Sequence, residues 1–133
     1  MLFPSLYSYG DFGLLALRLV LAAIFLVHGV PKLKNPAGIS QAIGASSGMG
    51  LAIGLAETLG GASVGLGVLT QVGAAALAVI MLGALHFKIN RWKMPFTAMD
   101  KTGWEFDLLI LAAAVLLLFS GPGSIALDPA LGL

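Results

Sequence analysis

The chain has 133 residues, of which 59% are hydrophobic and only 10% are charged, and its mean hydropathy is +1.00. Soluble domains carry about 25% charged residues, so this composition excludes a soluble globular domain. It indicates instead a single membrane domain over residues 1–133. The net charge of +1 gives no indication of a nucleic-acid partner.

The absence of cysteine narrows the chemistry. Disulfides, thiolate metal sites and iron–sulfur clusters formed by this chain alone are excluded. A redox function would therefore need a bound cofactor, a substrate that carries the electrons, or a partner chain.

Four apolar runs are expected to cross the bilayer, at about residues 12–33, 48–69, 72–87 and 104–120. Each is close to the roughly 17–25 residues that a spanning helix needs. Only helices and closed barrels satisfy their backbone in a bilayer, and these runs lack the alternation of barrel strands. The sequence therefore predicts an all-α, four-helix transmembrane bundle.

Basic residues outside the spans gather in the two connections at residues 34–47 and 88–103. Asn-Pro and Ser-Ser-Gly steps in the first of these predict a loop. The two termini and the short corner at Thr70 and Gln71 carry no Lys or Arg. The positive-inside rule then predicts that both connections are cytoplasmic and both termini are outside.

The second span is rich in glycine, with two GxxxG pairs, Gly50/Gly54 and Gly61/Gly65. Small residues at this spacing allow two helices to approach closely. Packing within the bundle is the ordinary interpretation, and homo-oligomerisation through this face is the alternative.

Glu57 lies in the middle of the second span, where a carboxylate costs about 2.5–3.5 kcal/mol on insertion scales and usually has a partner. The first span offers Arg18, His28 and Lys32 within one stripe at about 100° per residue. We assume that Lys32 and Gly48 lie at the same depth in the membrane. At a rise of ~1.5 Å per residue, Arg18 and Glu57 then lie roughly 8 Å apart along the helix axis. We therefore predict a central Arg18–Glu57 ion pair.

A second polar cluster is expected near the cytoplasmic end, where His28 and Asp107 are joined by His86 and Glu105. Such a cluster could be a proton relay, a metal site or a polar pocket. The spacing contains no tight ligand pair, so a metal is not expected. Glu105 could instead cap its helix, Lys32 could extend to the interface, and His86 could simply be solvated.

Three stretches resemble the DoxX family of small four-helix membrane proteins. They are Arg18 with FLVHGVPKL, then GLAETLGGASVGLGVLT, then WEFDLLILAAAVLLLFSGPGSIALD. The positions that match the family pattern are Arg18, His28, Gly29, Lys32, Glu57, Gly60, Gly61, Glu105 and Asp128. Gln71, Phe106 and Ser124 stand where the family often has Arg, Tyr and Arg.

The resemblance implies a multi-pass protein of a prokaryotic plasma membrane, because family members are linked to a thiosulfate:quinone oxidoreductase and to terminal quinol oxidases. The leading hypothesis is a redox-associated protein that binds a quinone or a small substrate and works with a membrane oxidoreductase complex. If it is an enzyme, it would be a quinone-linked oxidoreductase component. Haem is not expected. The alternatives are a non-catalytic scaffold or assembly subunit and, ranked last, a small-solute channel or transporter.

Under this hypothesis the residues fall into two groups. Glu57 and Arg18 would position or protonate the bound group, and His28 and Asp107 would carry protons to the cytoplasmic face. The expected ligand-binding residues are Lys32, His86, Glu105, Gly60 and Gly61.

Overall fold

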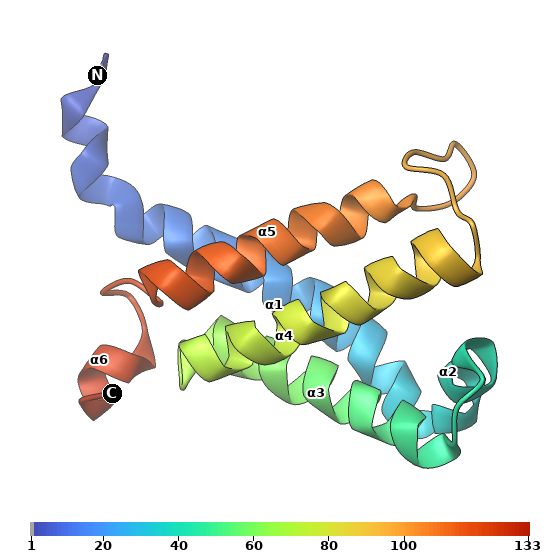
Figure 1. Ribbon diagram of the computed structural model, residues 1–133. Helices are drawn as coiled ribbons and strands as arrows, with labels where there is room; N and C mark the ends of the chain where they lie inside the picture. Colours follow the sequence, from blue (N-terminus) through green and yellow to red (C-terminus); the bar gives the residue numbers. More distant parts are fainter. Residues whose placement is uncertain (1) are drawn as a thin grey trace.

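The computed structural model describes residues 2–133, and this part of the chain is helical without a strand, which confirms the all-α prediction. Four long helices form the bundle (Figure 1): α1 (Gly10–Lys34), α3 (Ser47–Leu66), α4 (Thr70–His86) and α5 (Trp104–Ser120). Three helical stretches are long and apolar enough to cross a membrane, namely Pro4–Lys34, Ser47–Leu66 and Thr70–Arg91. The 17 residues of α5 are at the lower limit of the roughly 17–25 residues that span a bilayer.

Shorter helices extend this framework. A 3-10 turn, η1 (Pro4–Tyr9), leads into α1, and a π-helical segment, η2 (Phe87–Arg91), continues α4. A five-residue helix, α6 (Leu127–Leu131), lies near the C-terminus.

The prediction of a loop over residues 34–47 is wrong in part, because α2 (Pro36–Ile43) is helical. Pro36 occupies the first turn, where proline costs no hydrogen bond. Gly44 ends the helix in the left-handed conformation at φ 71°. The Ser40 hydroxyl accepts a hydrogen bond from the Gly50 N–H at 3.0 Å and so joins α2 to α3.

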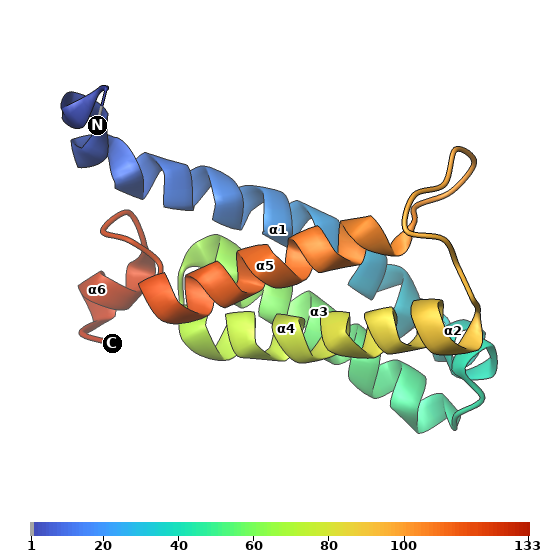
Figure 2. The same ribbon diagram turned by 45° about the horizontal axis from the view of Figure 1, so that its top comes forward.

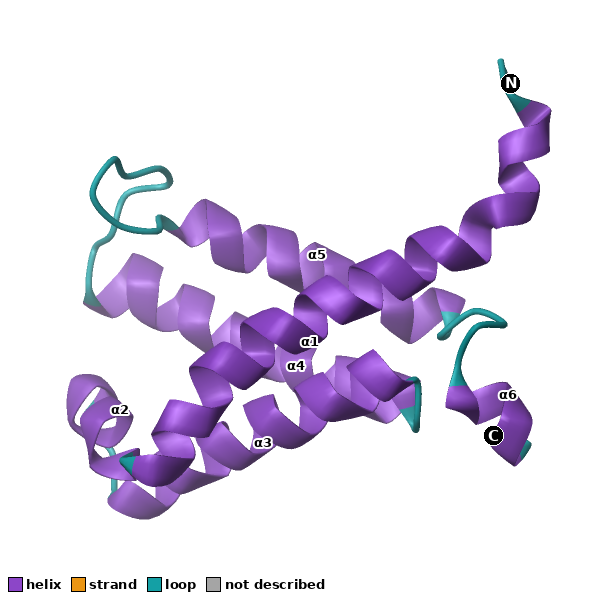
Figure 3. Cartoon of the chain, turned by 180° about the vertical axis from the view of Figure 1, so that it is seen from behind, coloured by secondary structure: helices purple, strands orange, loops and turns teal. Residues whose placement is uncertain are grey.

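The four long helices form two layers. α1 packs mainly on α3, α4 packs mainly on α5, and the contact between α3 and α4 joins the layers. Seen from behind in Figure 3, α1 and α3 lie in front of α4 and α5. The layers separate toward the end that carries α2 and the connection after η2, which we call the loop end.

Both chain termini lie at the opposite end of the bundle, the terminal end (Figures 1 and 2). The two basic connections thus share one end and the termini share the other, as the charge pattern predicts. The buried apolar core fills the space between the layers in the terminal half and the middle of the bundle. It comprises Leu21, Phe25, Val64, Ala74, Leu77, Ala78, Met81, Ile110, Ala114 and Leu117.

The glycines of α3 serve packing within the chain. At each of the four GxxxG glycines, an added Cβ would come within 3.0 Å of an atom of α1 or α2. The Cβ of an alanine at Gly61 would stand 2.9 Å from the Cβ of Phe25, and one at Gly60 would stand 2.9 Å from Cδ2 of Leu77 in α4. Gly60 and Gly61 therefore let α3 approach α4 and α1, respectively.

This packing predicts opposite effects for two Gly→Ala changes. Gly61→Ala should lower the stability of the protein in detergent by about 1–3 kcal/mol, the usual cost of overpacking. Gly13→Ala in α1 has no atom within 4 Å of the new Cβ and should gain the better helix propensity, roughly 0.8–1 kcal/mol. Thermal unfolding followed by circular dichroism compares the two variants, and equal melting temperatures would contradict the packing role of Gly61.

Candidate functional site

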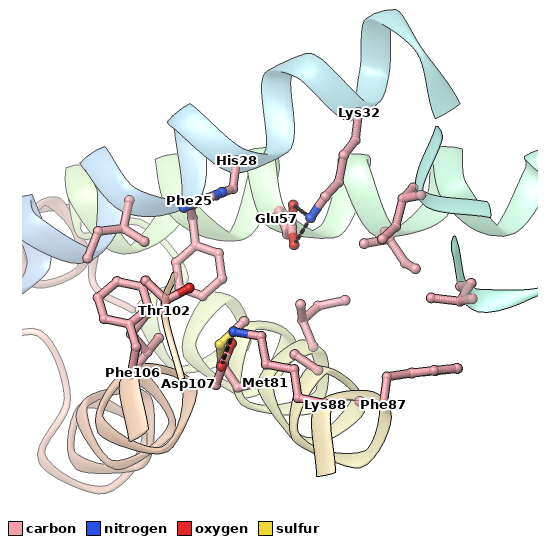
Figure 4. Close-up of a pocket in the computed structure, with 18 of the residues that line it drawn as sticks. Phe25, His28, Lys32, Glu57, Met81, Phe87, Lys88, Thr102, Phe106 and Asp107 are labelled. Carbon is pink, nitrogen blue, oxygen red and sulfur yellow. Dashed lines mark hydrogen bonds and ion pairs between the residues drawn. The ribbon is translucent and has the colours of Figure 1, made fainter. Parts of the chain in front are cut away.

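A cavity of about 440 Å³ lies between the two layers in the loop half of the bundle (Figure 4). All four long helices, together with α2 and η2, contribute to its wall. Four aromatic side chains line it: Phe25, Phe87, Trp92 and Phe106. An apolar, concave site with a few convergent polar groups is the usual form of a small-molecule site.

One ion pair joins α1 to α3 at the cavity. The Lys32 Nζ lies 2.5 Å from Oε1 and 2.6 Å from Oε2 of Glu57. The Glu57 side chain is only 4% exposed, and that of Lys32 is 23% exposed. Glu57 thus has a charged partner, but it is Lys32, and the predicted Arg18–Glu57 pair is wrong.

The first reason for the error is the register of α1 against α3. We expected Gly48 to be level with Lys32, whereas an added Cβ at Gly54 would contact the Cβ of Lys32 at 3.0 Å. The difference of six residues (54 − 48) moves Glu57 by ~9 Å toward the loop end. Helical α2 causes this shift, because it lets α3 begin beyond the end of α1.

The second reason is the direction of the side chains. In a helix each Cα–Cβ bond leans toward the N-terminus, and α1 and α3 run in opposite directions. Lys32 and Glu57 therefore lean toward each other, whereas Arg18 and Glu57 lean apart. Glu57 is in fact level with Gly29, where an added Cβ would stand 2.9 Å from the Glu57 Cβ.

A second ion pair faces the first across the cavity (Figure 4). The Lys88 Nζ lies 2.5 Å from Oδ2 of Asp107, and the side chains are 15% and 9% exposed. Asp107 belongs to α5, and Lys88 belongs to η2. Sequence reasoning counted Lys88 only as a loop charge, because the apolar run ends at residue 87. The helix continues as a π-helical turn, a feature that often occurs at functional sites.

His28 also lines the cavity, from the α1 side and next to Phe25 (Figure 4). Its side chain is exposed, so it lies at the edge of the cavity. The structure thus brings together four of the predicted site residues, Glu57, Lys32, His28 and Asp107. It adds Lys88, Trp92 and Thr102, none of which the sequence predicted as site residues.

The other predicted site residues do not line this cavity. Gly60 and Gly61 serve packing, as described above. His86 is exposed, with its Nδ1 3.2 Å from the Asn90 Nδ2. Glu105 lies in the first turn of α5, a position that favours an acidic side chain.

Arg18 belongs to a separate cluster at the terminal end and is only 2% exposed. Its Nε donates to the Val64 carbonyl at 2.9 Å, and its Nη2 donates to the Gly65 carbonyl at 3.2 Å. Nη1 donates to the carbonyls of Pro122 and Ile125, both at 2.8 Å. The first two carbonyls belong to the last turn of α3, where helix carbonyls lack partners and a cation is favourable.

Asp128 completes this cluster from the other side. Its Oδ1 accepts from the Leu69 N–H at 2.6 Å and its Oδ2 from the Thr70 N–H at 3.0 Å, at the start of α4. Its own N–H donates to the Gly67 carbonyl at 2.7 Å. Arg18 and Asp128 together hold the C-terminal segment, residues 121–133, against the corner between α3 and α4.

The environment of Asp128 determines its ionisation. Burial alone would raise the pKa of this carboxyl, but the Thr70 and Leu69 N–H groups and the nearby Arg18 charge outweigh burial. The pKa is therefore held below its ordinary value of 3.8. A lowered pKa means that ionised Asp128 stabilises the docked segment above pH 3.8 and that this contribution is lost as the pH falls through the lowered value.

We therefore predict that pepsin cleaves the C-terminal segment of the protein in micelles more readily as the pH is lowered from about 5 to about 2. In Asp128→Asn, cleavage should be easier at the upper end of this range and should increase less toward the lower end. Asp11→Asn is the matched control, because Asp11 contacts the same segment at Ser124 and its loss should leave the pH dependence intact. An unchanged pH dependence in Asp128→Asn would contradict the assignment.

Comparison with known proteins finds relatives that match most of the length of the chain. The DoxX family model matches residues 13–91. A protein of Bacillus subtilis named "Putative oxidoreductase CatD" is 33% identical over 122 residues, covering 90% of this chain and 87% of that protein. An uncharacterized membrane protein of Mycobacterium tuberculosis is 30% identical over 136 residues, covering 92% of this chain and 83% of that protein. No solved structure matches the chain.

Proposed function

Because this chain belongs to the DoxX family, we propose that it is a redox-associated membrane protein that binds a quinone in the cavity between its two helical layers. We further propose that it works with a membrane oxidoreductase complex, which supplies the electrons that the bound quinone accepts. The observation that carries the proposal is the pair of lysine–carboxylate bridges facing each other within aromatic walls. The name of the Bacillus subtilis relative, which refers to an oxidoreductase, is consistent with it.

The charge of the cavity favours an uncharged ligand. Two lysines and two carboxylates cancel, and each pair is internally balanced. A charged ligand would leave one unbalanced charge inside the membrane, where such charges are expensive. A quinone is neutral and planar, and its rings and carbonyls match aromatic walls and polar donors.

Each lysine retains donors for such a ligand. An ammonium group has three N–H donors. Lys32 uses two of them on Glu57, and Lys88 uses one on Asp107. The remaining N–H groups can donate to the carbonyl oxygens of a quinone.

The same groups would supply the protons of the reaction. Reduction of a quinone to a quinol takes up two electrons and two protons, one proton on each oxygen. Lys32, Lys88 and His28 can donate protons at the cavity, and Glu57 and Asp107 hold the two lysines in position there. The electrons come from the partner oxidoreductase. Arg18, which sequence reasoning placed in this role, has no part in the proposed site because its hydrogen bonds lie at the terminal end.

We predict that replacing one bridge by neutral residues of similar size, in Lys32→Met/Glu57→Gln, weakens quinone binding while preserving the fold. Neutral replacement of both members of a buried ion pair is often tolerated. Loss of one hydrogen bond to a charged donor, worth ~1.5–3 kcal/mol, should weaken binding by roughly 10- to 150-fold. Quenching of tryptophan fluorescence in lipid nanodiscs reports binding, because Trp92 lines the cavity.

The matched control is Glu105→Gln, which removes a carboxylate near the same end but outside the cavity. Its quinone affinity should equal that of the unmodified protein. Unchanged affinity in the folded double variant would overturn the proposal. If no quinone binds and a stoichiometric partner co-purifies, the scaffold alternative is favoured.

A further inference from the structure

We propose that the cavity opens toward the membrane between α3 and α4 and that this opening admits the hydrocarbon tail of a membrane-borne ligand. This inference rests on the proposed function, since the ligand's polar head would occupy the ion pairs. The proposed ligand is then not any quinone but one that carries a long prenyl or alkyl chain. Such a quinone would enter the cavity from the bilayer rather than from water.

One stripe of α4 and η2 forms the first edge of the opening. Val79, Gly83 and Phe87 follow one another at four-residue spacing, so they lie on one face of the helix. All three line the cavity. Val79 is also 67% exposed and Gly83 is exposed. The same stripe thus faces both the cavity and the outside of the protein.

Isoleucines form the opposite edge. Ile39 and Ile43 of α2 and Ile53 of α3 line the cavity. α3 and α4 touch closely nearer the terminal end, where an added Cβ at Gly60 would meet Leu77 at 2.9 Å. They separate toward the loop end (Figure 1), and the opening lies in this wedge. Its edges are apolar, which suits a hydrocarbon chain.

The depth of the opening determines what it faces. The stretch Thr70–Arg91 has 22 residues, or ~33 Å of helix. Gly83 lies eight residues before Arg91, so it is ~12 Å from the Arg91 end of this helix. The hydrocarbon core is ~30 Å thick, so a residue at this distance from the helix end lies within it. Gly83 therefore faces lipid acyl chains, and a ligand that enters there is dissolved in the bilayer.

Gly83 is the position at which the opening can be closed without disturbing the fold. No atom lies within 4 Å of an added Cβ, so a larger side chain would extend into open space. A helix interior also favours leucine over glycine. Gly83→Leu should therefore fold and should narrow the path between the cavity and the lipid.

The test compares two probes in lipid nanodiscs: decylubiquinone and the same ubiquinone head group without a tail. Gly83→Leu should weaken binding of the tailed probe by about tenfold or more, because ~1.4 kcal/mol is within the cost of forced overpacking. Binding of the tail-less probe should stay unchanged. Gly13→Leu is the control, since Gly13 has the same open surroundings but does not line the cavity.

The outcomes separate the two proposals. A selective loss of the tailed probe supports the opening. Equal loss of both probes, or loss of neither, overturns the opening and leaves the quinone site standing. If the unmodified protein binds neither probe, both proposals fail.

Discussion

The architecture depends on one constraint, the need to neutralise every charge inside the hydrocarbon region with groups of the protein itself. Lipid supplies no hydrogen bonds there, and an isolated buried charge is costly. Lys32–Glu57 joins α1 to α3, and Lys88–Asp107 joins η2 to α5. Each bridge therefore connects two helices of one layer and leaves the space between the layers to the cavity.

The two halves of the bundle have different tasks. In the terminal half the core is apolar, and Arg18 and Asp128 attach the C-terminal segment to the corner between α3 and α4. The packing in this half sets the position of the two helical layers relative to each other. In the loop half the layers separate, and the wall carries ionisable groups. A rigid junction at one end can thus position polar side chains at the other end without filling the space between them.

Sequence reasoning predicts those features that depend on local pattern. The four apolar runs, the shared end of the basic connections and the packing role of the α3 glycines follow from hydropathy, charge and residue size. The register of α1 against α3 does not, because it depends on α2, whose helical fold displaces α3 by six residues of helix, or ~9 Å. Lys88 was missed for a related reason. An apolar run marks where a helix meets the interface but does not show that the helix continues as η2.

The sequence-based pairing of Arg18 with Glu57 also took no account of backbone carbonyls as acceptors for a buried arginine. Arg18 satisfies its guanidinium with four backbone carbonyls, two of them in the negative end of the α3 dipole. A planar fork of five donors suits such fixed acceptors. Lysine is a mobile point charge that can hold a carboxylate and still turn a donor toward a ligand. The two residue types therefore have different roles. Arg18 stabilises the fold at the terminal end, where no ligand is proposed to bind, and the lysines line the cavity, where a ligand must bind and dissociate.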